Sequence, residues 1–153
     1  MSEPTISIDT AVMITDISRR TLWRRVKEGL LPKEQFDSRG RTMIAITAIK
    51  GMLSLPITDE DLHLLAMADG GDAESQNEIG VMFLELDRAE SAAHWFALAA
   101  KQEHVDAIHH LSRLYYLGYG VEQDEAQGQL WLAKAAAYGH KIAQAQLKAT
   151  LTE

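Results

Sequence analysis

Basic side chains are concentrated in one short stretch near the amino terminus. Eight of the nine Lys and Arg residues in the first 56 positions fall between residues 19 and 41. Clustered cations bind polyanions, and a local block of this kind in an otherwise acidic protein is typical of a nucleic-acid-binding module. The chemistry that these residues offer is therefore binding, by contacts to phosphates and base edges. The simpler alternative is a solvated helix face.

The remainder of the chain is acidic. Residues 1–56 hold nine Lys/Arg and six Asp/Glu, a balance of +3, whereas residues 57–153 hold six and sixteen, a balance of −10. Opposite signs in the two parts of a 153-residue chain favour two modules. We expect the domains to be residues 1–56 and 57–153, because Pro56 ends one helical pattern and Thr58 or Asp59 caps the next.

The composition excludes several classes of protein. A chain that is 46% hydrophobic and 24% charged is globular, and the absence of cysteine excludes disulfides, zinc–thiolate sites and a cysteine nucleophile. The amino-terminal residues do not resemble a signal peptide, so a cytoplasmic protein that does not associate with a membrane is expected. No P-loop, nucleophile elbow or dinucleotide-binding glycine motif is present, which predicts neither an enzyme nor a cofactor.

Six histidines raise the question of a metal site. His109 and His110 are adjacent and would point in different directions on a helix, with no acidic residue four positions on, so no metal site is expected. His104 and His140 occupy equivalent positions in a repeat described below. A shared capping or packing role is the better prediction for that pair.

The sequence predicts that a helix, a tight turn and a second helix position the basic cluster. Asp9 is predicted to cap a helix over residues 10–14, and Ser18 to cap a helix over residues 19–28 that Gly29 ends. Leu22 and Val26 mark the buried side of the second helix, so its other side is cationic and suited to a major groove. The predicted DNA contacts on this helix are Ser18, Arg19, Arg20, Thr21, Arg24, Arg25 and Lys27.

A basic wing is predicted after Pro32. Residues 38–41 form a turn and residues 42–44 favour a strand, which together describe a hairpin over residues 33–45. Arg39 and Arg41 would stand at its tip and contact backbone phosphates. Residues 46–53 read as a short packing helix.

The string ISRRTLWRRVKEGLLP, followed by DSRGR, resembles the winged helix-turn-helix of the MerR and excisionase-like families. The resemblance covers about residues 6–53 and implies DNA binding by the helix after Ser18 and by the wing. Two features depart from MerR regulators. Arg24 and Arg25 replace an aromatic pair, and no long dimerising helix follows.

The acidic part contains an internal repeat. His104, Ala107 and Leu111 recur 36 residues later as His140, Ala143 and Leu147, and the spacing W-x-x-x-A-A that begins at Trp95 recurs at Trp131 with the same period. Apolar residues at helical spacing in each copy predict a pair of helices, and the end of the chain reads as a closing helix. A degenerate half repeat over residues 63–71 precedes them.

The better-preserved copy resembles the Sel1-like repeat, a relative of the tetratricopeptide family. The residues that carry the likeness are Ala107, Leu111, Tyr115, Gly118, Gly120, Val121, Asp124, Trp131, Lys134, Ala135, Ala136 and Gly139. The resemblance implies stacked helix pairs that bind partner proteins and perform no chemistry.

The sequence as a whole predicts a mainly α protein, with a small winged helix-turn-helix domain followed by a short α-solenoid of Sel1-like helix pairs. The expected function is that of a DNA-binding transcriptional regulator. Its partners would be double-stranded DNA and a protein bound by the repeats, with a homodimer as one form of that association. The alternative is an interaction adaptor whose winged module binds an acidic protein surface in place of DNA.

Overall fold

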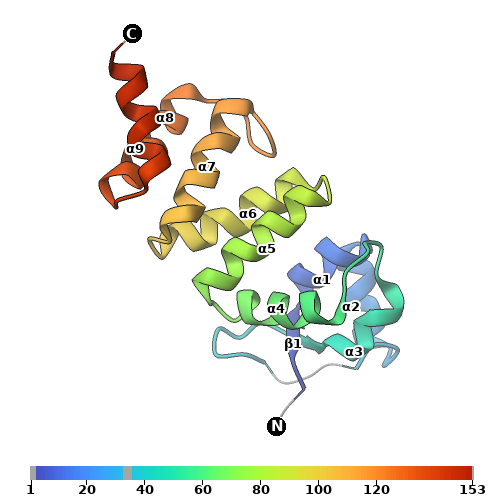
Figure 1. Cartoon of the computed structure of the whole chain (residues 1–153). Helices are drawn as coiled ribbons and strands as arrows, with labels where there is room; N and C mark the ends of the chain where they lie inside the picture. The colour runs from blue at the N-terminus through green and yellow to red at the C-terminus, as the bar shows by residue number, and fades with distance from the viewer. Residues whose placement is uncertain (1–2, 33–35, 153) are drawn as a thin grey trace. The chain divides into compact units, whose positions relative to one another are not determined.

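The computed structural model describes residues 3–32 and 36–152, and it divides into two compact units, Met1–Gly71 and Asp72–Glu153 (Figure 1). Residues 33–35, with which the predicted wing begins, lie outside the described residues. The first unit contains β1 (Thr5–Ser7), α1 (Ile8–Thr15), α2 (Arg19–Lys27), β2 (Met43–Ala45), α3 (Ile46–Ile49), the 3-10 turn η1 (Lys50–Met52) and α4 (Asp59–Asp69). The second contains α5 (Ala73–Glu85), α6 (Ala89–Lys101), α7 (Val105–Leu117), α8 (Glu125–Ala137) and α9 (Lys141–Leu151).

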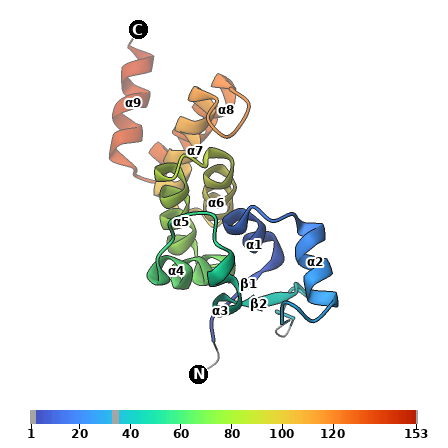
Figure 2. The ribbon, with the colours of Figure 1, turned by 90° about the vertical axis from the view of Figure 1, so that its right-hand side faces the viewer.

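The two strands of the first unit pair with each other. β1 lies beside β2 and runs antiparallel to it (Figure 2). Ile6 is opposite Ile44, and both of these side chains are fully buried. The strand expected after the turn therefore exists, but its partner is the amino-terminal segment. The expected hairpin is reduced to a single bridge between Phe36 and Thr42 among the described residues.

The first helix begins slightly earlier than the sequence suggests. Ser7 caps α1, because its Oγ accepts a hydrogen bond from the Thr10 backbone N–H, so the prediction of Asp9 as the cap is wrong. Ser18 caps α2 as predicted, accepting from the Thr21 N–H at 3.1 Å. Asp9 instead lies in the first turn of α1, where a negative charge is favourable.

Helix α4 belongs to the first compact unit and contacts β1. Thr58 and Asp61 form a reciprocal capping box at its start, and its buried side carries Leu62, Leu65 and Ala68. The division between the units therefore falls after Gly71, whereas the sequence places the boundary at residue 56. The helix that reads as a degenerate half repeat packs with the amino-terminal elements.

The second unit is a series of packed helix pairs. α5 packs on α6, α7 packs on α8, and α6–α7 and α8–α9 contacts join successive pairs. The apolar residues at helical spacing are largely buried, with Phe83, Trp95 and Phe96 as the largest fully buried side chains of this unit. Ala143 is the buried residue of α9, as suits a closing helix. No helix in the described part of the chain has both the length and the apolar character needed to cross a bilayer.

Candidate nucleic-acid interface

The exposed side of α2 carries a row of cations. Leu22 is the buried residue of this helix and anchors it. Arg20, Arg24 and Lys27 are all exposed and follow the spacing i, i+4, i+7, which places them on one face. None of these three takes part in an ion pair among the described residues. The helix therefore presents positive charge that no carboxylate of the described structure neutralises.

The amino-terminal end of α2 is organised by its cap. The Ser18 hydroxyl donates to Thr21 Oγ1 at 2.9 Å while it accepts from the Thr21 backbone N–H. Both predicted contact residues are thus engaged in starting the helix. Their role in this structure is to set the first turn, from which Arg20 and Arg24 project.

Two other predicted contacts on α2 are engaged elsewhere. Arg19 forms an ion pair with Asp9, and both side chains are more than half exposed, so water screens the pair and its contribution to stability is small. Arg25 is half-buried, and its Nη1 lies 3.0 Å from the thioether sulfur of Met52. The Arg25 guanidinium thus contacts Met52 of η1 and is less exposed than the row of Arg20, Arg24 and Lys27.

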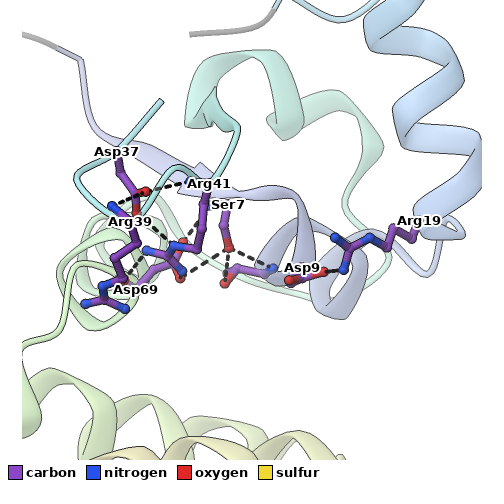
Figure 3. A network of polar contacts seen from close by, with 8 residues as sticks. Ser7, Asp9, Arg19, Asp37, Arg39, Arg41 and Asp69 are labelled. Atoms are coloured by element: carbon purple, nitrogen blue, oxygen red, sulfur yellow. Dashed lines mark hydrogen bonds and ion pairs between the residues drawn. The ribbon is translucent and has the colours of Figure 1, made fainter. Parts of the chain in front are cut away.

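The turn at residues 37–41 is built around one carboxylate. Oδ1 of Asp37 accepts the backbone N–H groups of Arg39, at 3.0 Å, and Arg41, at 2.8 Å (Figure 3). Gly40 has φ of 75°, a left-handed conformation that glycine adopts without strain. This geometry leaves the Arg39 side chain exposed.

Arg41, which the sequence predicts as a phosphate contact, is bound within the first unit in this structure. Its Nε donates to Asp37 Oδ2 at 2.8 Å, its Nη1 to Asp69 Oδ1 at 2.8 Å, and its Nη2 to the Asp69 carbonyl oxygen at 2.8 Å (Figure 3). The Asp69 side chain is 4% exposed and that of Arg41 28%. Two carboxylates and one backbone carbonyl therefore engage all three nitrogens of this guanidinium.

The same contacts determine the protonation of the network. Burial acts to raise the pKa of Asp37, but hydrogen bonds from Arg41 and from the Arg39 backbone outweigh it and lower the pKa below 3.8. Burial acts to lower the pKa of Arg41, and its hydrogen bonds to Asp69 and Asp37 reverse this and raise it. Arg41 and Asp37 are therefore both charged at neutral pH, and their charges cancel.

Sequence reasoning missed the two residues that hold Arg41. Asp37 could have been found, because an Asp three positions before a Gly is a common turn signal. Asp69 lies 28 residues from Arg41 and no local pattern marks it. It also accepts hydrogen bonds from the Ser7 backbone N–H at 2.5 Å and hydroxyl at 3.2 Å, and so ties α4 to the start of α1.

The histidines have structural roles. His104 and His140 cap α7 and α9, accepting at Nδ1 from the N–H groups of Ala107 and Ala143, which confirms the predicted shared role. Each also reaches the preceding repeat with Nε2, which lies 2.7 Å from Glu74 for His104 and 3.3 Å from Asp106 for His140. Among the described residues, no group of three or more His, Asp or Glu is arranged to hold a metal ion.

The repeat unit is expected to lose stability as the pH falls. Burial lowers the pKa of both His109 and His110 below 6.5, so the unfolded chain binds protons at a pH where the folded one does not. The free energy of unfolding should therefore be smaller at about pH 5.5 than at about pH 7.5, as urea titrations would measure.

His110→Phe provides the comparison for this pH dependence. His110 stacks on Phe96 with ring centroids 4.7 Å apart, and a phenyl ring can keep that contact but cannot take up a proton. The pH dependence of stability should be reduced in His110→Phe and retained in a variant of the exposed His63. An unchanged pH dependence in His110→Phe would show that His110 does not contribute.

Comparison with solved structures identifies the fold of the repeats. The chain is similar to a Sel1 repeat protein from Oxalobacter formigenes, with 33% identity and a TM-score of 0.55, over 58% of this chain and 27% of that one. It is also similar to c5321, a protective antigen present in uropathogenic Escherichia coli strains that displays an SLR fold. There the identity is 30% and the TM-score 0.55, over 64% of this chain and 21% of that one.

The matched region is a minor part of both proteins, since this chain spans about a quarter of their length. No family model and no curated protein matches the chain. The arrangement predicted from the repeat period, in which helix pairs stack in succession, is the one that the second unit adopts. About three fifths of the chain therefore has the Sel1-like repeat fold.

Proposed function

We propose that the first unit is a winged helix-turn-helix module that binds double-stranded DNA through the exposed row of α2 and through Arg39. The observation that carries this proposal is the face formed by Arg20, Arg24 and Lys27, which is exposed and has no carboxylate partner in the described structure. An α-helix fits the major groove of B-DNA, where arginine reads guanine and cations contact phosphates.

The Sel1-like repeats would bind the protein partner of this DNA-binding protein. The repeat unit, residues 72–153, holds six Lys/Arg and twelve Asp/Glu, a balance of −6, which suits association with a basic protein surface. A single small winged module makes few phosphate contacts, so either a homodimer or a bound partner would be needed to extend the DNA footprint.

One observation favours the alternative, an adaptor that binds an acidic protein in place of DNA. Arg19 and Arg41 are paired with carboxylates, so the positive charge available to a polyanion is smaller than the sequence suggests. The net charge of −7 adds long-range repulsion from DNA. The two functions differ in whether the unpaired row on α2 binds phosphate.

Binding of the full-length protein to duplex DNA across a salt series distinguishes them. We expect log K to fall linearly with log salt, because each phosphate that a cation neutralises releases counterions. Arg20→Ala/Arg24→Ala should weaken binding and make the slope shallower by up to about 2, at roughly 0.9 for each phosphate that is no longer neutralised.

The matched control removes the same charge from the repeat unit. Lys141 and Lys148 are exposed on α9, and Lys141→Ala/Lys148→Ala should leave the salt slope unchanged. Equal reductions in affinity for the two double variants would indicate a non-specific charge effect. If the wild-type protein binds no duplex even at low salt, the DNA proposal is wrong and the adaptor function is favoured.

A further inference from the structure

We propose that Arg41 is a positioning residue of the DNA interface, held by Asp69, and that it acts by orienting Arg39. This inference rests on the proposed function. It assigns a role to α4, because Asp69 is the last residue of that helix. It also separates the two arginines of the turn into one that contacts phosphate and one that does not.

Arg41 is not available to a phosphate. Three of its nitrogens donate to Asp37 and Asp69, each at 2.8 Å. Moving the guanidinium to DNA would leave the Asp69 carboxylate, 4% exposed, without its cation, which is strongly unfavourable. A phosphate approaching Arg41 would also meet the repulsion of two carboxylates.

The Arg41 contacts determine the shape of the turn. Asp37 uses Oδ2 for the Arg41 guanidinium and Oδ1 for the N–H groups of Arg39 and Arg41 (Figure 3). One carboxylate therefore joins the anchored side chain to the backbone that carries Arg39. Because Asp69 binds the other edge of Arg41, the end of α4 holds this turn against the start of α1, where Ser7 also binds Asp69.

The effect of Asp69→Asn on DNA binding has opposite signs for a positioning role and for a purely electrostatic one. Asp69→Asn removes a negative charge, so simple electrostatics predicts tighter binding to DNA. If Asp69 acts by positioning, the variant should bind more weakly, because an amide cannot hold the guanidinium as a carboxylate does. Opposite expectations make this variant decisive.

The experiment is a double-mutant cycle on the full-length protein with duplex DNA. Arg39→Ala should weaken binding and reduce the salt slope by about 0.9, the effect expected for a single phosphate. Asp69→Asn should weaken binding when Arg39 is present and have no further effect in the Arg39→Ala background. Glu60→Gln, which removes one exposed charge from the same helix, is the control and should not weaken binding.

Asp69→Asn binding as tightly as Glu60→Gln, or a weakening that persists without Arg39, would overturn the inference. If Asp69→Asn does not fold, Arg41→Lys replaces it: the charge is kept, but an ammonium cannot bridge both carboxylates in the fixed geometry of a guanidinium. Arg41→Lys should show the same weakening with Arg39 present and no further weakening without it. Circular dichroism establishes whether each variant is folded.

A second readout separates this inference from the proposed function. Amide hydrogen exchange of Arg39 and Arg41, whose N–H groups bind Asp37, should be faster in Asp69→Asn than in Glu60→Gln. Unchanged exchange would show that Asp69 does not order the turn and would overturn the positioning role. If the wild-type protein does not bind DNA but amide exchange is faster in Asp69→Asn, the proposed DNA binding is wrong. The control of the turn by Asp69 is then still supported.

Discussion

Trp95→Ala is expected to lower the free energy of unfolding of the repeat unit by about 3–5 kcal/mol, the cost typical of removing a large aromatic side chain from a core. Trp95 is 1% exposed and lies in α6, which packs against both α5 and α7. Its Nε1 has no hydrogen-bond partner among the described residues, so the destabilisation comes from packing and apolar burial. Urea unfolding followed by far-UV circular dichroism measures it.

The equivalent residue of the next repeat provides the matched control. Trp131 occupies the same repeat position but is only half-buried, and Lys134 Nζ lies 5.4 Å from its ring centroid. Trp131→Ala should cost about 1–2 kcal/mol, from partial burial and one cation–π interaction. The different burial of Trp95 and Trp131 predicts different losses of stability for the same substitution. Equal destabilisation by the two variants would contradict this prediction.

Gly120→Ala is expected to destabilise the repeat unit by about 2–5 kcal/mol, from a strained backbone and a steric clash together. Gly120 has φ of 75°, and a Cβ built there would overlap the backbone carbonyl of Ala89, at the start of α6. Backbone cannot move aside as a flexible side chain can. The loops before α6 and before α8 should therefore separate, which thermal unfolding would detect as a lower Tm.

Gly139→Ala isolates the strain from the clash. Gly139 has φ of 95°, and a Cβ at that position meets no atom within 4 Å. This variant should lower the free energy of unfolding by only about 1–2 kcal/mol, which is the strain of an alanine in the left-handed conformation. If Gly120→Ala is no more destabilising than Gly139→Ala, the backbone near Ala89 relaxes at little cost.

The repeat architecture was predictable because it is encoded locally. Apolar residues at helical spacing, the glycines of the turns and the recurrence of Trp95 at Trp131 predict helix pairs, and the structure contains α5–α6 and α7–α8 in that order. Burial was not predictable from the same signal. Trp95 is followed by a further helix pair and Trp131 only by α9, so identical motifs are buried to different extents.

The sequence showed that basic residues are clustered, but it predicted only in part which of them are exposed and unpaired. The spacing of Arg20, Arg24 and Lys27 places them on the free face of α2, and Ser18 begins that helix as predicted. Arg41 belongs to the same cluster in the sequence. Its charge is neutralised by Asp37 and by Asp69, and the second of these partners comes from a helix that the sequence assigns to the other module.

By itself, the sequence determined the helices and their caps at Ser18, His104 and His140, because each depends on residues within a few turns of one another. It also determined the repeat period, because the same residue types recur at a fixed spacing along the chain. Tertiary structure alone decided that α4 packs with the amino-terminal unit and that Arg41 is a structural cation and not a free one. The reason is physical. A buried carboxylate such as Asp69 needs a cation and several donors, and distant segments supply them only when the chain has folded.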